Sequence, residues 1–353
     1  MKPIKQQQVI SHLKRWAGHI KQWADHLKHC TCYLKRWASL IKRCISREHL
    51  WMSVPIACAA ALVLLVMVKS CQGITYSRSN ECKLLLLDYS LPEARVILQT
   101  LTKEQTDSLI ARIGHDTLVC PVITHRYFIA DKLERYLAFH KIDTAATLND
   151  IISIVNAGAD RKGYEVSTLS DTTKGYLILV NKYHHLPKNY KRQDMVPFNK
   201  TCSYKGNQAV QAVVDAFVKM QQACKKATDC MVMVSSSYRT FDEQHYSHSV
   251  YHDKLAAQPG HSEHQTGLAL DITSMEHPEK WSFGKSKEGV WIRENCHKFG
   301  FVLRYPEGKS RITGYDYEPW HLRYVGIEAA QRIHDEGLTF DEYYAFYVER
   351  EAK

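Results

Sequence analysis

The 353-residue sequence predicts a mixed helix-and-strand protein that begins with a single membrane-spanning helix. Short apolar runs bounded by turn residues are typical of strands, and longer runs with apolar side chains every three or four positions are typical of helices. Residues 51–68 form a stretch without a charged side chain, and this stretch is long enough to span a bilayer. The content of 45% hydrophobic and 24% charged residues is that of a globular protein.

The first 50 residues carry most of the net positive charge. They hold eleven Lys and Arg residues against two acidic ones, a net charge of +9, whereas the rest of the chain carries about +1. The basic charge therefore indicates membrane topology and not nucleic-acid binding. We expect this segment to stay in the cytoplasm and the residues from about 70 onward to lie outside it.

A seven-residue repeat runs through the same basic segment. Its two apolar series are Leu13, Ile20, Leu27, Leu34 and Ile41, and Trp16, Trp23, Cys30, Trp37 and Cys44. One interpretation is a coiled coil that makes a homodimer. Three Trp side chains pack poorly in a two-stranded coil, so we favour a basic amphipathic helix over residues 1–50 on the inner membrane surface.

Residues 51–69 are the predicted transmembrane helix. A cleavable signal peptide has a much shorter basic region before its apolar core, and Lys69 is a poor fit to a lipoprotein cleavage site at Cys71. We therefore expect an uncleaved anchor. Seven cysteines follow it, and their odd number leaves at least one thiol outside any disulfide.

Residues 70–165 are predicted to form a linker and a helical spacer. Helix starts are predicted at Leu91, Thr102 and Thr147. From 166 to 353 strands are predicted at 176–180, 231–234, 267–272 and 301–305, and helices at 209–224, 290–300, 327–334 and 339–347. His184 and His185 follow the first of these strands, and we interpret them as structural.

The strand at 267–272 is unusual on one face. Because alternate residues of a strand share a face, Gly267, Ala269 and Asp271 point one way and three large aliphatic residues point the other. Two small residues beside a carboxylate leave room for a ligand or a metal to approach the backbone. His264 precedes this strand and could turn toward that space.

A second His and a second carboxylate occur at 317–325, a segment rich in strand-forming aromatics. Two His and one Asp can make an open zinc site with water in the fourth position, and a nearby Glu can take the proton of that water. The chain has 19 His residues, however, and most His residues in proteins lie at the surface or are buried with their hydrogen bonds made by protein groups. The spacing alone leaves both interpretations open.

The residue types and their spacing within the two segments are more specific evidence than the presence of two His and one Asp. Ser262-x-His264-x-x-Gly267-x-Ala269-x-Asp271, followed by Glu318-x-x-His321, resembles the metal signature of the VanY/VanX-type D-alanyl-D-alanine peptidases. The resemblance covers roughly residues 85–345. It implies an α+β fold with a central antiparallel sheet flanked by helices, one Zn²⁺ ion, and a peptidoglycan stem peptide as substrate.

The resemblance also implies a role for each site residue. His264, Asp271 and His321 would bind the zinc, and Glu318 would be the catalytic acid and base. Ser237-Tyr238-Arg239-Thr240, with Gln244, resembles the family segment S-G-Y-R-S/T-x-x-x-Q, so Arg239 would hold the terminal carboxylate with Gln244 and Ser262 assisting. Ser237 stands where the family has Gly, which changes the turn that aims Arg239.

The resemblance makes this chain a membrane-anchored zinc D,D-carboxypeptidase that removes C-terminal D-Ala from peptidoglycan stem peptides. The nearest alternative is an L,D-carboxypeptidase acting on tetrapeptide stems with the same site. Two other classes remain: a non-catalytic cell-wall binding protein, which an intact ligand set with Glu318 disfavours, and a membrane scaffold that acts through the repeat.

Overall fold

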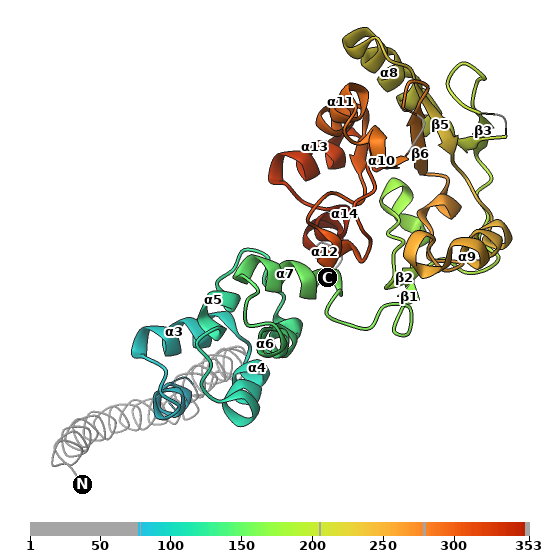
Figure 1. Ribbon diagram of the computed structural model, residues 1–353. Helices are drawn as coiled ribbons and strands as arrows, with labels where there is room; N and C mark the ends of the chain where they lie inside the picture. The colour runs from blue at the N-terminus through green and yellow to red at the C-terminus, as the bar shows by residue number, and fades with distance from the viewer. Residues whose placement is uncertain (1–76, 78, 205, 278–279, 350–353) are drawn as a thin grey trace, which may run out of the picture. The chain divides into compact units, whose positions relative to one another are not determined.

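The computed structural model describes residues 77, 79–204, 206–277 and 280–349 (Figure 1). The predicted helix at 1–50, its seven-residue repeat and the predicted anchor at 51–69 lie outside these residues. Among the helices in the described part, none is long and apolar enough to cross a membrane. The chain divides into two compact units, Met1–Lys83 and Leu84–Lys353, and the second carries all the elements below.

Short helices follow one another from residue 91 to residue 157, as predicted for the spacer. They are α3 (Leu91–Thr100), α4 (Lys103–Ser108), the π-helix η1 (Leu109–Ile113), α5 (Val119–Ile123), the 3-10 helix η2 (Ala130–Lys132), α6 (Leu133–Ile142) and α7 (Leu148–Ala157). Capping boxes at Ser90, Thr102 and Thr147 start three of them by satisfying their first free N–H groups. The spacer core also takes in Ala345 and Phe346 from near the C-terminus.

The centre of the remaining part is a four-stranded antiparallel sheet in the order β5-β6-β8-β7, which confirms the predicted α+β class. Its strands are β5 (Val232–Ser236), β6 (Ala269–Ser274), β8 (His321–Tyr324) and β7 (Phe301–Leu303). The predicted strands at 231–234, 267–272 and 301–305 therefore all belong to one sheet. Two further pairs are short: β1 (Thr168–Leu169) with β2 (His184–His185), and β3 (Met195–Pro197) with β4 (Gln208–Val210).

The two faces of this sheet differ in chemistry. On one face Leu270, Leu322 and Phe301 join an apolar core with α8 (Gln211–Thr228) and α11 (Lys287–Asn295). Alternation puts Asp271, His321 and Arg323 on the other face, where all three are buried. The apolar face holds the sheet on its helices, and the polar face forms the site.

Several helices complete this part of the chain. They are η3 (Thr172–Leu177), α9 (Phe241–Leu255), η4 (Glu263–Thr266), α10 (Lys280–Phe283), η5 (Cys296–Phe299), α12 (Ser310–Thr313), α13 (Ile327–Glu336), α14 (Phe340–Tyr343) and the π-helix η6 (Tyr344–Val348). Thr339 caps α14 with Glu342 in the predicted capping box. Six described cysteines, Cys82, Cys120, Cys202, Cys224, Cys230 and Cys296, are free thiols.

The strand predicted at 176–180 is wrong. The segment is the end of η3 followed by irregular backbone, although Ile178 and Val180 are fully buried. The guanidinium of Arg323 donates to the carbonyls of Tyr176 and Ile178, at 2.9 and 2.7 Å, so these groups are taken by a side chain and not by a strand partner. Ile178 and Val180 are thus buried without the backbone hydrogen bonds of a β-sheet.

The predicted start of the strand at Gly267 is also wrong. Gly267 has φ +70°, a left-handed conformation that closes η4, and β6 begins at Ala269. A Cβ at this position would lie 2.7 Å from the sulfur of Met195. The small residue therefore serves a turn and close packing, and it does not leave room for a ligand.

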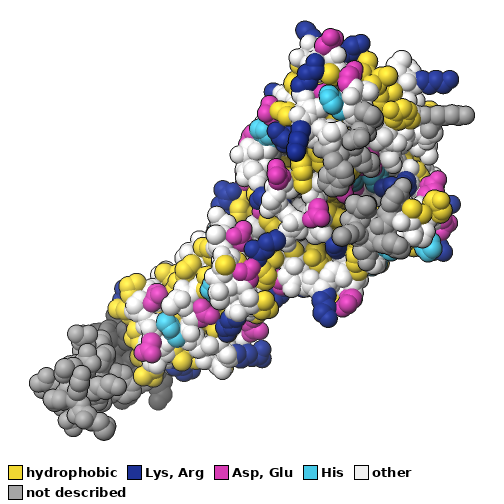
Figure 2. All heavy atoms as spheres, in the orientation of Figure 1, with side chains coloured by type: hydrophobic (Ala, Val, Ile, Leu, Met, Phe, Trp, Pro, Cys, Tyr) yellow, Lys and Arg dark blue, Asp and Glu magenta, His cyan; other side chains and the backbone are white. Residues whose placement is uncertain are grey.

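On the face drawn in Figure 2, basic and acidic side chains are interspersed over the described residues. This agrees with the near-neutral charge calculated for the chain after residue 50.

Candidate active site

Three of the predicted site residues meet on the polar face of the sheet. Asp271 of β6 and His321 of β8 are direct cross-strand partners, so their side chains leave the sheet on the same side. His264 comes from η4, the turn that leads into β6. One nitrogen of each His and one oxygen of Asp271 all lie within 4.8 Å of one another, and all three residues are buried.

The two imidazole rings present different nitrogens to this group. Nε2 of His264 lies 3.4 Å from Oδ1 of Asp271, while Nδ1 of His264 donates to the carbonyl of Ser237 at 2.6 Å. In His321 it is Nδ1 that lies 3.3 Å from the same Asp271 oxygen. The orientation of each ring therefore depends on the group that its second nitrogen, the one turned away from Asp271, contacts.

Ser237, which departs from the family segment, is held by two hydrogen bonds. Its hydroxyl accepts from the backbone N–H of Gln208 at 3.0 Å and donates to Oδ1 of Asn207 at 2.9 Å. Its carbonyl thus stays aimed at His264. The backbone N–H of Arg239 donates to the carbonyl of His264 at 3.3 Å, which ties the Arg239 turn to η4.

The charges around the cluster favour a cation. Burial, followed by the positive charge of Arg239, lowers the pKa of His264 to about 4, so this ring is neutral at pH 7. Burial also lowers the pKa of His321, but the carboxylates of Asp271, Glu263 and Glu318 outweigh it and raise this pKa to about 9. Glu263 is already paired with two arginines, so Asp271 and Glu318 are the acidic groups beside His321 whose charge a metal ion would neutralise.

Glu318 lies in the turn before β8. Its backbone N–H donates to the carbonyl of Tyr305 at 3.0 Å, and its own carbonyl accepts from the N–H of His321 at 3.1 Å. Its carboxylate Oε2 is 3.5 Å from Nδ1 of His321, and its side chain is 19% exposed. Glu318 therefore lies beside the His–Asp–His group with access to solvent.

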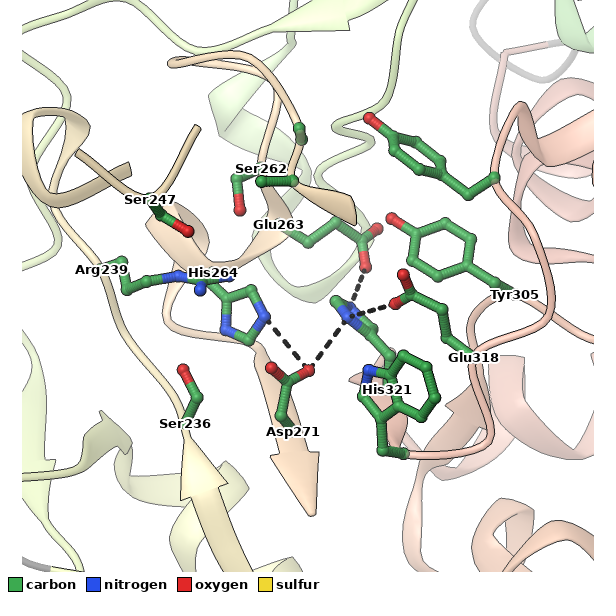
Figure 3. Close-up of a pocket in the computed structure, with 14 residues that line it drawn as sticks. Ser236, Arg239, Ser247, Ser262, Glu263, His264, Asp271, Tyr305, Glu318 and His321 are labelled. Atoms are coloured by element: carbon green, nitrogen blue, oxygen red, sulfur yellow. Dashed lines mark ion pairs between the residues drawn. The ribbon is translucent and has the colours of Figure 1, made fainter. Parts of the chain in front are cut away.

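A cavity of about 440 Å³ opens over this group. It is lined by all three cluster residues, by Glu318, and by Arg239 and Ser262 from the predicted substrate site. Figure 3 shows Arg239 and Ser262 on the His264 side of the cavity and Glu318 with Tyr305 on the His321 side. The cavity thus has one basic end and one acidic end.

Gln244 does not reach this cavity. It is 1% exposed, and its amide donates to the backbone carbonyl of Ala257 at 2.7 Å. Ala257 itself lines the cavity, so Gln244 supports the wall from behind. A direct contact between Gln244 and substrate, as predicted from the segment, is not what this geometry favours.

Sequence reasoning missed Glu263, Tyr305 and Tyr315, which also line the cavity. Burial raises the pKa of both phenols well above their usual value, so both line the cavity as neutral hydroxyls. Glu263 is next to His264 in the sequence, which marks it as a candidate, but its contact is with the ring of His321 and depends on the fold. The two Tyr residues gave no comparable signal.

A second acidic group has its ligand atoms equally close together. It consists of Cys230, Glu276 and Glu288. Here His277 pairs with Glu288 at 2.8 Å, and Ser274 donates to Glu276 at 2.9 Å, so the carboxylates have protein partners. We assign no metal to it.

The His264–Asp271–His321 group fits zinc. Two imidazole nitrogens and one carboxylate oxygen are the usual protein donors of a catalytic zinc site, which keeps a fourth position for water or substrate. All three residues line the cavity, so a fourth ligand could reach the ion from there.

The known proteins that this chain resembles are carboxypeptidases. The family model described as D-alanyl-D-alanine carboxypeptidase, VanY, matches residues 206–327. The putative carboxypeptidase YodJ of Bacillus subtilis (strain 168) is 40% identical over 182 residues, covering 48% of this chain and 66% of the relative. The bifunctional D-Ala-D-Ala dipeptidase and D-Ala-D-Ala carboxypeptidase VanXYC of Enterococcus gallinarum is 33% identical over 187 residues, covering 49% of this chain and 95% of the relative.

A D-alanyl-D-alanine carboxypeptidase of Enterococcus faecium is 30% identical over 207 residues. This chain spans 66% of the length of that relative and of YodJ. The LdcB LD-carboxypeptidase structure is 36% identical with a TM-score of 0.48, and covers 51% of this chain and 90% of its own. A VanY mutant from a VanB-type resistance cassette in complex with Zn(II) is 32% identical with a TM-score of 0.40, and covers 48% of this chain and 98% of its own.

Proposed function

Because this chain belongs to the VanY family of zinc D-alanyl-D-alanine carboxypeptidases, we propose that it removes the C-terminal D-Ala from peptidoglycan stem peptides. The observation that carries the proposal is a single cavity that joins His264, Asp271 and His321 with Glu318 at one end and Arg239 at the other. This is a metal donor set, a base and a carboxylate receptor in one place. Zn²⁺ is the cofactor that the donor set fits.

Arg239 supports an exopeptidase. A planar guanidinium binds a terminal carboxylate through two parallel hydrogen bonds, which an internal peptide bond does not offer. Its Nε is buried without a hydrogen-bond partner, which leaves a donor for such a group. Ser262, which lines the cavity near Arg239, is the second polar contact that we assign to the terminal residue.

Each residue at the site has a separate role in the proposed reaction. His264, Asp271 and His321 would hold the ion, which would lower the pKa of a bound water to roughly 7 and polarise the scissile carbonyl. Glu318 accepts a proton from the attacking water and transfers it to the nitrogen of the leaving D-amino acid as the C–N bond breaks. Arg239 holds the terminal carboxylate so that the scissile carbonyl lies over the metal site.

We place the enzyme at the cell membrane, anchored by residues 51–69 with the catalytic part outside the cytoplasm. The uncharged stretch and the eleven basic residues before it support this placement. Peptidoglycan stem peptides are available on that side of the membrane. A homodimer through the seven-residue repeat is a weaker part of the proposal, because the Trp series suits a membrane surface better.

The test is mass spectrometry of stem peptides incubated with the full chain in detergent and zinc. A pentapeptide that ends in D-Ala-D-Ala should lose one D-Ala, while a tetrapeptide that ends in a single D-Ala should persist. Cleavage of the tetrapeptide alone would make the enzyme an L,D-carboxypeptidase. Binding of both peptides without cleavage would make it a cell-wall binding protein.

The ligand assignment is tested in the same preparation. His264→Ala and His321→Ala should each lose zinc and abolish cleavage. His245→Ala, on the exposed side of α9, is the matched control and should keep both. Stoichiometric zinc in either ligand variant would show that the metal is bound elsewhere.

A further inference from the structure

One carboxylate in the cavity wall has no part in the chemistry above. Glu263 lies between Ser262 and His264, and its side chain is completely buried. A buried carboxylate is costly unless it is paired, so its partners indicate why it is there.

The two oxygens of Glu263 face different groups. Oε1 accepts from Nε of Arg304 and from Nη1 of Arg323, both at 2.7 Å. Oε2 accepts no hydrogen bond from these arginines and lies 3.5 Å from Nε2 of His321. That nitrogen is likewise buried without a hydrogen-bond partner, so the two atoms face each other. Figure 3 marks the contact between Glu263 and His321 with a dashed line.

The opposite nitrogen of the same ring belongs to the metal site. Nδ1 of His321 lies 3.3 Å from Asp271 on the cavity side. A neutral imidazole carries a single proton, and the nitrogen that binds a metal must offer its lone pair. If Nδ1 is the ligand, the proton has to be on Nε2, where it needs an acceptor.

The arginines hold that acceptor in place. Arg304 is fixed by a second pair of contacts to Asp341, at 2.5 and 3.0 Å. Arg323 is fixed by the carbonyls of Tyr176 and Ile178. Two arginines and two carboxylates make the cluster neutral, which permits its complete burial.

Building on the zinc site of the proposed function, we propose that Glu263 is a positioning residue for His321. Its Oε2 accepts the Nε2–H of His321 and so keeps Nδ1 free for the metal, while Arg304 and Arg323 keep the carboxylate aimed at the ring. His264 solves the same problem with a backbone acceptor, the carbonyl of Ser237. The two rings thus have different partners, a backbone carbonyl for His264 and the carboxylate of Glu263 for His321.

The test is zinc affinity, measured on the full chain by competition with a chromogenic chelator. Removing such a partner of a metal-binding His typically costs about 10–100-fold in affinity. We expect that loss in Glu263→Gln, because its single carbonyl oxygen is needed by the two arginines, which leaves its NH2 group, a donor, facing Nε2 of His321. We expect it also in Glu263→Asp, which still neutralises the arginines but draws the carboxylate back from His321.

Asp341→Asn is the matched control, because it removes one negative charge from the same buried cluster without touching His321. It should lower the unfolding temperature while its zinc affinity stays within about 3-fold of the parent chain, since a metal ligand keeps its strength when its own partner is intact. If Glu263→Gln fails to fold, the zinc affinity of Glu263→Asp is compared with that of the parent chain and of Asp341→Asn instead.

Two results would overturn the inference. One is parental zinc affinity in a folded Glu263→Asp or Glu263→Gln chain, and the other is an equal loss of affinity in Asp341→Asn. A parent chain that binds no zinc would overturn this inference together with the metal site. A parent chain that binds zinc but cleaves no stem peptide overturns the proposed function alone, and the affinity ratios still decide the role of Glu263.

Discussion

At the scale of single residues, the ligand and the base that we propose come from one short segment and point in different directions. Glu318 and His321 are three residues apart, yet His321 is the first residue of a strand and points to the metal group, whereas Glu318 lies in the turn and borders the cavity. Two neighbouring side chains can therefore have different tasks. The assignment of base and ligand follows from this difference.

We predict that Glu318→Gln keeps zinc and the fold but loses roughly 10²–10⁴-fold in turnover, because general acid–base catalysis contributes about that much. Gln keeps the shape of Glu and cannot take a proton from water. The measurement is kcat for a D-Ala-D-Ala peptide alongside zinc content, with the exposed Glu328→Gln as control. Near-normal turnover would contradict the mechanism, and lost zinc would make Glu318 a ligand.

Arg239 should act on the terminal carboxylate alone. Hydrogen bonds to charged groups contribute about 1.5–3 kcal/mol, so Arg239→Ala should lower kcat/KM by roughly 10–100-fold. Arg239→Lys should recover only part of this loss, because an ammonium group lacks the paired geometry. The decisive comparison uses a peptide whose C-terminus is amidated: the parent enzyme should discriminate against it, and Arg239→Ala should not. Equal discrimination in both would move the carboxylate receptor elsewhere.

At the scale of elements, a pair of His side chains where η5 contacts α13 is expected to make the fold sensitive to acid. His297 of η5 is 5% exposed, and its ring stacks on His334 of α13 with centroids 3.6 Å apart. Burial, together with the positive charge that His334 and Lys298 can carry, lowers the pKa of His297. The folded protein thus prefers the neutral ring.

The sign of the pH effect follows from this shift. Below about pH 6.5 the unfolded chain takes up a proton at this position more readily than the folded one. The free energy of unfolding should therefore be highest above that pH and should fall as the pH drops through the folded-state pKa. His297→Phe keeps a stacked ring and removes the titration, so the fall should be shallower.

Urea unfolding of the metal-free chain at pH 7.5 and pH 5 measures this difference. The exposed His245→Gln on α9 is the control and should follow the parent chain. Parallel pH curves for His297→Phe and the parent would show that His297 does not contribute to acid sensitivity.

At the scale of the whole molecule, the charge asymmetry of the chain predicts its orientation in a membrane. A periplasm-type reporter, active only outside the cytoplasm, should work when fused after Lys353 and fail when fused after residue 50. The reason is that eleven basic residues precede the uncharged stretch and are retained on the cytoplasmic side. Activity of a cytoplasm-only reporter at Lys353 would reverse the topology.

Features that depend on neighbouring residues could be predicted before the fold was known. The capping boxes at Thr102 and Thr339, and the buried strand after Met231, are set by side chains within a few positions of one another. Two of the candidate metal donors were also readable, because one short motif gives the identity and spacing of His264 and Asp271. Local interactions do not require knowledge of the fold.

Contacts between residues far apart in the sequence could not be predicted in this way. The pairing of Asp271 with His321 is a strand register between segments 50 residues apart, and a shift by one residue would turn one of them away. The contact of Glu263 with His321, the withdrawal of Gln244 behind the cavity wall and the capture of the 176–180 backbone by Arg323 are of the same kind. Each depends on which groups are buried together, and burial is a property of the packed chain that no sequence window contains.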